Sequence, residues 1–118
     1  MEYTTLGKTG LKVSVAGLGC GGFSRVGRGT GRTQEESVAL IRRSLDLGVN
    51  FIDTAAAYGT EDIVGEVIRQ VGRDGLVISS KTGICDLDGV RYGVSNIVAS
   101  LERSLETLGI DTIDIFHL

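Results

Sequence analysis

The chain has 118 residues, of which 42% are hydrophobic and 23% charged, and its formal net charge is -3. These values fit one globular domain with its own core and give no indication of a nucleic-acid surface. No apolar run is long enough to span a membrane, and the N-terminus lacks the apolar segment of a signal peptide. The two cysteines, Cys20 and Cys85, have no metal-ligand partners at a useful spacing. We therefore expect reduced thiols, a cytoplasmic location and no metal site.

The N-terminal segment is predicted to form a hairpin followed by a strand. Residues 3–14 hold two β-prone runs on either side of a Gly-Lys-Thr-Gly turn, which predicts a β-hairpin. The apolar run over residues 13–22 predicts a strand that leads into glycines. The Gly-rich stretch after it carries three arginines, Arg25, Arg28 and Arg32. They fit either a solvated loop or an anion-binding loop.

A helix and a second strand come next. Residues 33–48 predict a helix, because Thr33 and Glu36 form a capping box and Gly48 stands at its end. Five apolar side chains form the expected core-facing stripe of this helix. They are Val38, Leu40, Ile41, Leu45 and Leu47. The run NFID, residues 50–53, predicts a buried strand.

The second half of the chain repeats this alternation. Helices are expected over residues 60–72, with Thr60 as N-cap, and over residues 95–109, with Ser95 as N-cap. Strands are expected over residues 75–81 and 111–118. The predicted order is a hairpin, then four strands that alternate with three helices, which indicates parallel strands with right-handed crossovers in an α/β fold.

Polar side chains stand at the ends of these strands. Asp53 ends one strand, Lys81 ends the next, and His117 lies beside the last residue of the final strand. Tyr58 follows Asp53 on the connecting loop. Because the C-terminal ends of parallel strands meet at one edge of a sheet, the four side chains should gather there. We expect Asp53 and Lys81 to form a buried ion pair.

Such a group can donate a proton to a carbonyl oxygen. An ammonium group beside a phenol favours the phenolate, and a carboxylate holds the ammonium in place. A histidine can donate a hydrogen bond to the substrate oxygen or relay a proton. Carbonyl reduction also needs a hydride, for which a nicotinamide cofactor is the natural source. Each of the four side chains, taken alone, also fits an ordinary structural role.

Several stretches of the chain resemble the aldo-keto reductase family. They are YTTLGKTGLKVSVAGLGCGGF, GVNFIDTAAAYG with the following TEDIVGE, VISSKTG, and SLERSLETLGIDTIDIFHL. They run through nearly the whole chain in the family's order and spacing. The form NFIDTA is most similar to the bacterial-type reductases and to the potassium-channel β-subunit branch.

The resemblance implies a (β/α)8 TIM barrel whose bottom is closed by an N-terminal hairpin, and reduction of aldehydes and ketones with NADPH. It implies a catalytic tetrad of Asp53, Tyr58, Lys81 and His117, with Tyr58 as general acid. It also implies cofactor contacts in the stretch after the first barrel strand. These contacts would be Cys20, Gly21, Gly22 and Asp53.

A complete barrel takes about 250 residues, so residues 1–118 should form a partial barrel, the N-terminal half. We therefore expect a small carbonyl substrate for the longer reductase and no activity from the isolated chain. The alternative is an inactive fragment that associates with itself or with a complementary C-terminal half. Unpaired strand edges, such as that of residues 111–118, favour such association.

Overall fold

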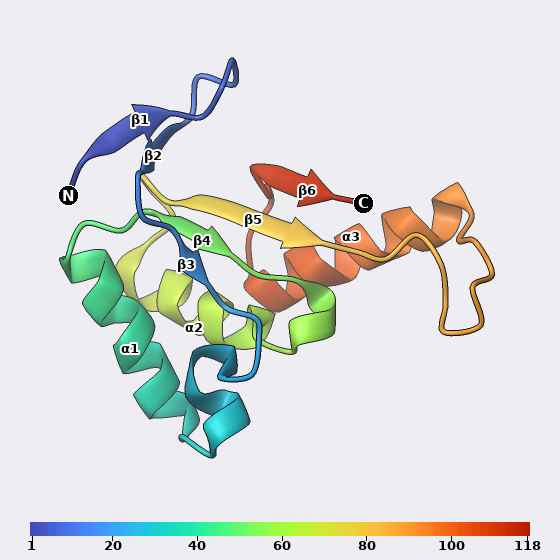
Figure 1. Cartoon of the computed structure of the whole chain (residues 1–118), viewed down its shortest axis with the longest axis horizontal. Helices are drawn as coiled ribbons and strands as arrows, with labels where there is room; N and C mark the ends of the chain where they lie inside the picture. The colour runs from blue at the N-terminus through green and yellow to red at the C-terminus, as the bar shows by residue number, and fades with distance from the viewer.

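The computed structural model describes residues 1–118 and has the predicted order of elements (Figure 1). An antiparallel hairpin precedes a four-stranded parallel sheet in the order β3-β4-β5-β6. The strands are β1 (Tyr3–Thr5), β2 (Lys12–Ser14), β3 (Leu18–Gly19), β4 (Phe51–Asp53), β5 (Val77–Lys81) and β6 (Ile115–His117). The expectation of an α/β fold with a parallel sheet and an N-terminal hairpin is confirmed.

The helices pack along one side of this sheet, with α2 between α1 and α3 (Figure 1). They are α1 (Gln34–Asp46), α2 (Glu61–Val71) and α3 (Val94–Leu108). Two short 3-10 helices, η1 (Arg25–Thr30) and η2 (Ala56–Tyr58), lie in the connections after β3 and β4. None of the helices combines the length and the apolar character that crossing a membrane requires.

The core lies between the sheet and the helices. Ile52 of β4 and Ile78 of β5 are register partners, and both are fully buried against the helices. The helices contribute further apolar side chains, among them Ile41, Val64 and Leu108. Because side chains alternate along a strand, the neighbours of Ile52 and Ile78 point to the opposite face, which no helix covers.

Helix α1 begins with the predicted capping box. The Thr33 hydroxyl accepts a hydrogen bond from the Glu36 backbone N–H at 3.2 Å, and the Glu36 carboxylate accepts from the Thr33 N–H at 2.9 Å. The apolar stripe is narrower than expected, since Leu40 and Leu47 are 40% and 57% exposed. Of the five predicted side chains, only Val38, Ile41 and Leu45 face the core. Ile41 and Leu45 follow Val38 by three and seven residues, the spacing of one helix face.

Thr60 occupies the predicted N-cap position of α2, but its side chain makes no capping bond, because its buried hydroxyl is already paired with the Thr54 hydroxyl at 3.0 Å and with the Cys20 carbonyl at 3.3 Å. The other predicted N-cap, Ser95, is wrong. Helix α3 begins one residue earlier than expected. Gly93 precedes it, and its N–H donates to the Asn96 side chain at 3.1 Å.

The first and last parallel strands are shorter than predicted. Ser14 still belongs to the hairpin, and the Asn50 amide fastens it there by accepting from the Ser14 N–H at 2.7 Å, so β3 starts only at Leu18. At the other edge the Asp114 carboxylate accepts from the Ile78 N–H at 2.7 Å and pairs with Arg73. The Asp114 N–H also donates to the Ile78 carbonyl at 3.1 Å, so the side chain and the backbone of Asp114 both hold the start of β6, which begins at Ile115.

Gly65 marks the closest approach of α2 to α3. A Cβ atom at this position would lie 2.7 Å from the Thr107 carbonyl oxygen and 2.9 Å from that of Leu108. Both oxygens belong to the backbone of the last turn of α3, so neither can move aside without shifting the helix. The glycine therefore sets the distance between the two helices.

We predict that Gly65→Ala lowers the free energy of unfolding by about 1–3 kcal/mol, because the new methyl group forces the helices apart. The measurement is urea denaturation followed by far-ultraviolet circular dichroism. Gly19→Ala is the matched control, since a Cβ there meets nothing within 4 Å. Equal destabilisation by the two substitutions would contradict the assigned role of Gly65.

Candidate active site

The strand register brings the predicted site residues to one edge of the sheet. Asp53 is the register partner of both Gly19 and Ser79, and Lys81 is the partner of His117. Partners in neighbouring strands share a face, and so do residues two apart in one strand. Asp53, Ser79, Lys81 and His117 therefore lie on the face of the sheet away from the helices.

An ion pair joins the ends of β4 and β5. The Lys81 ammonium lies 2.6 Å from the Asp53 carboxylate and also donates to the Thr54 carbonyl at 3.0 Å. The Ser79 hydroxyl donates to the same carboxylate oxygen at 2.7 Å. The side chains of Lys81 and Asp53 remain 31% and 37% exposed, so the pair is half-buried rather than buried as expected.

Tyr58 lies beside this pair. It ends the short helix η2, and its ring centroid is 5.3 Å from the Lys81 ammonium, within the range of a cation–π contact. The ring also packs on Gly21, where a Cβ atom would come within 2.7 Å of two ring carbons. The Tyr58 hydroxyl makes no hydrogen bond to the protein, so it is free to meet a ligand.

His117, the fourth predicted site residue, is linked to the others only by backbone pairing and by no side-chain contact. Its register partner is Lys81, and its carbonyl accepts from the Thr82 N–H at 3.1 Å. The imidazole is exposed and has no hydrogen-bond partner within the chain. The structure therefore brings Asp53, Lys81 and Tyr58 into contact and places His117 beside them on the same face.

The glycine-rich stretch after β3 divides into a buried and an open part. The Cys20 thiol is fully buried in the core, and burial together with the nearby Asp53 carboxylate raises its pKa to about 12. Its backbone N–H and carbonyl are also bonded, to Asp53 and to Thr60. Cys20 thus has no group free for a ligand and is not retained as a cofactor contact.

Gly21 and Gly22 are different, because their backbone N–H groups donate no hydrogen bond within the protein. Gly21 lies beside the Tyr58 ring, and Gly22, the next residue, is exposed. Free N–H donors near a phenol whose hydroxyl is unpartnered suit the polar edge of a flat ring. In these respects the residues present fit a nicotinamide.

Arg28 has an internal role rather than that of a solvated or anion-binding residue. Its guanidinium donates to both carboxylate oxygens of Asp62, at 2.9 and 2.7 Å, and to the Gln34 side chain at 2.9 Å. It also donates to the carbonyl of Gly59, the residue after Tyr58. Arg28 therefore ties η1 to the loop that carries Tyr58. The hydrogen bond from Arg28 lowers the pKa of the Asp62 carboxyl.

Two further polar contacts of β5 were missed from the sequence, one at the site and one between the sheet and α2. The Ser79 hydroxyl donates to the Asp53 carboxylate, and the Ser80 hydroxyl donates to the buried Glu61 carboxylate at 2.6 Å. A signal was present, since the run VISSK places two hydroxyls inside a buried strand and buried hydroxyls need partners. Their partners lie on other elements and could not be read from the run itself.

Comparison with known proteins gives a consistent result. The family model described as "Aldo/keto reductase family" matches residues 17–118. Aldo-keto reductase YhdN of Bacillus subtilis (strain 168) is 36% identical over 125 residues, which cover 100% of this chain and 38% of the relative.

Solved structures share the fold. PA4992 of Pseudomonas aeruginosa, assigned as an aldo-keto reductase, is 39% identical with a TM-score of 0.76, over 94% of this chain and 44% of that one. A Bombyx mori aldo-keto reductase in complex with NADP is 26% identical with a TM-score of 0.75, over 98% of this chain and 36% of that one. The chain thus spans less than half the length of each of these proteins.

We predict that Arg28→Met lowers the free energy of unfolding at pH 7 by about 1 kcal/mol, as expected for an exposed but bidentate pair. The folded-state pKa of Asp62 is depressed, so its contribution is present above the ordinary value of 3.8 and disappears as the pH falls through the depressed value. The difference between variant and wild type should therefore shrink below about pH 4. Urea titrations at pH 7 and pH 3 measure it.

Arg32→Met is the control, because the Arg32–Glu36 contact is longer, at 3.5 Å, and more exposed. Equal losses for Arg28→Met and Arg32→Met at pH 7, or a loss that does not depend on pH, would contradict the role assigned to Arg28.

Proposed function

The chain belongs to the aldo/keto reductase family, and on that premise we propose that it supplies the catalytic tetrad of an NADPH-dependent reductase of aldehydes and ketones. The observation that supports this most is the contact of Lys81 with both the Asp53 carboxylate and the Tyr58 ring. This arrangement fixes a cation beside a phenol whose hydroxyl is unpartnered. The reduction itself is the property of a longer protein that completes the barrel.

In the proposed mechanism Tyr58 is the general acid. Its hydroxyl donates a proton to the carbonyl oxygen, and the Lys81 ammonium stabilises the phenolate that remains. Asp53 holds the Lys81 ammonium in position, with support from the Ser79 hydroxyl. His117, exposed on the same face, orients the carbonyl by a hydrogen bond to its oxygen.

NADPH, when bound, supplies the hydride that no side chain can provide. Of the cofactor contacts implied by the family, Gly21, Gly22 and Asp53 are kept, and the free N–H groups of the two glycines support their inclusion. The Bombyx mori relative, solved in complex with NADP, supports the choice of the phosphorylated cofactor. A cytoplasmic location is part of the proposal and rests on the two unpaired cysteines.

A second candidate is an inactive piece that associates with itself or with a complementary chain. The observation in its favour is the sheet order, because β3 and β6 lie at the two edges and neither has an outer partner in this chain. An unpaired edge is a template for another strand. An activity measurement distinguishes the two candidate functions, since only the first predicts turnover when the remaining barrel strands are present.

We predict that Tyr58→Phe lowers turnover of an aldehyde by about a hundredfold or more in a reductase that contains this chain and the remaining barrel strands. The substitution keeps the ring on Gly21 and removes only the proton donor, so cofactor binding should persist. Steady-state oxidation of NADPH and a cofactor fluorescence titration measure the two effects. Wild-type turnover by the variant would remove Tyr58 from the mechanism.

The 118-residue chain alone should show no reductase activity, although all four tetrad residues are present. The face that carries Asp53 and Lys81 is covered by no helix, so water screens their coupling to Tyr58. Binding energy that positions the cofactor would also be reduced. The test is an NADPH titration and an aldehyde assay on protein whose measured mass shows that it contains no residue after Leu118. Micromolar binding with turnover would contradict the prediction.

A further inference from the structure

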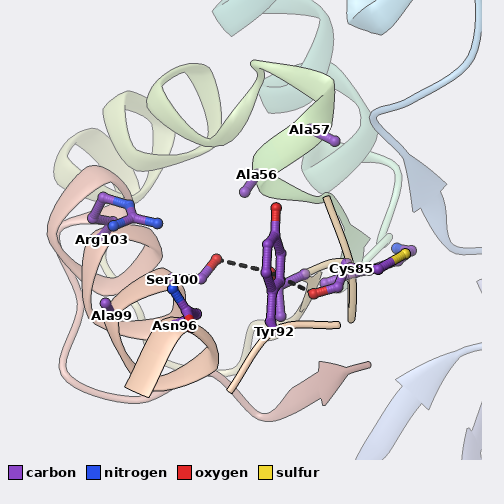
Figure 2. Close-up of a pocket in the computed structure, with 11 residues that line it drawn as sticks. Ala56, Ala57, Cys85, Tyr92, Asn96, Ala99, Ser100 and Arg103 are labelled. Carbon is purple, nitrogen blue, oxygen red and sulfur yellow. Dashed lines mark hydrogen bonds between the residues drawn. The ribbon is translucent and has the colours of Figure 1, made fainter. Parts of the chain in front are cut away.

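A cavity of about 430 Å³ lies between the loop after β4, the end of β5 and helix α3 (Figure 2). Its volume is within the range of small-molecule sites. The Tyr92 ring stands in the cavity with its hydroxyl toward Ala56, and Arg103 enters from α3 (Figure 2). Apart from Lys81, the cavity uses no residue of the tetrad.

The charge of the lining is one-sided. Two basic side chains, Lys81 and Arg103, line the cavity, and no Asp or Glu side chain does. Lys81 uses two of its three donors, on Asp53 and Thr54, which leaves one. The Arg103 guanidinium makes no hydrogen bond or ion pair within the chain.

Arg103 also borders a second cavity that contains carboxylates, and these are already engaged. Asp62 is bonded at both oxygens by Arg28, and Glu61 accepts from the Ser80 hydroxyl. Neither forms an ion pair with Arg103. The planar donor fork of Arg103 is therefore available to a ligand, and a carboxylate matches it in a two-point arrangement.

The remaining lining suits a short organic body attached to such an anion. Ala56, Ala57, Ala99 and the Tyr92 ring provide apolar surface. The Asn96 amide lies one turn before Ser100 on the same face of α3, and its NH2 group donates no bond within the chain. It can donate to the carboxylate beside Arg103.

We propose that this cavity binds small organic carboxylates, with Arg103 and Asn96 holding the carboxylate and the Tyr92 ring packing on the organic body. Since the cavity shares Lys81 with the tetrad, the favoured carbonyl substrates would be those that carry a carboxylate. That last step rests on the proposed function, whereas binding of the anion does not.

The test is binding of two probes of the same shape, benzoate and benzamide, to the ¹⁵N-labelled 118-residue chain at constant ionic strength. Benzoate should shift the amide signals of Ala56, Ala57 and Ala99 and reach saturation. Arg103→Gln should weaken benzoate binding about tenfold or more, the scale of a charge-assisted hydrogen bond, and leave benzamide unchanged. Because Arg103 is exposed and unpartnered, the variant should keep the fold.

Arg42→Gln is the matched control, since it removes the same charge from α1, away from the cavity. Arg103→Lys is a second variant, which keeps the charge without the fork and should give an intermediate loss. Equal affinities for benzoate and benzamide, equal effects of Arg103→Gln and Arg42→Gln, or shifts confined to other elements would each overturn the proposal. The readout needs no turnover, so these outcomes leave the proposed reduction standing, and failure of the Tyr58 test leaves benzoate binding unaffected.

Discussion

The ion pair between Lys81 and Asp53 is the interaction around which the site is arranged. It joins two neighbouring parallel strands at the point where both end, so it depends on their lengths and on their register. The same ammonium holds the Thr54 carbonyl and lies over the Tyr58 ring. A cation with these contacts fixes the start of the loop after β4 and the position of the phenol together.

The order of elements and the grouping of the tetrad can both be predicted from the sequence, because both depend on local patterns along the chain. Apolar runs that end in Asp53, Lys81 and His117 are local patterns, and a parallel sheet necessarily brings their ends together. The capping box at Thr33 is local too, and the structure contains it. What the pattern leaves undetermined is the competition between local and distant partners.

Thr60 is the clearest example of that competition. Its position before an acidic first turn is typical of an N-cap, but its hydroxyl is buried between Thr54 and Cys20. Arg28 similarly donates to Gly59 just after η2, to α1 and to α2, and no local pattern could reveal these partners. The position of Cys20 follows from the strand register, because Gly19 pairs with Asp53 and the residue after Gly19 points to the other face, into the core.

The alternation of side chains along β4 and β5 makes both the core and the site depend on the register of these two strands. Ile52 and Ile78 face the core, and Asp53 and Ser79, one residue on, face the site. A slip of either strand by a single residue would exchange the two sets, placing a carboxylate under the helices and an isoleucine at the rim. The register that places Asp53 and Ser79 at the site is therefore the same register that buries Ile52 and Ile78 in the core.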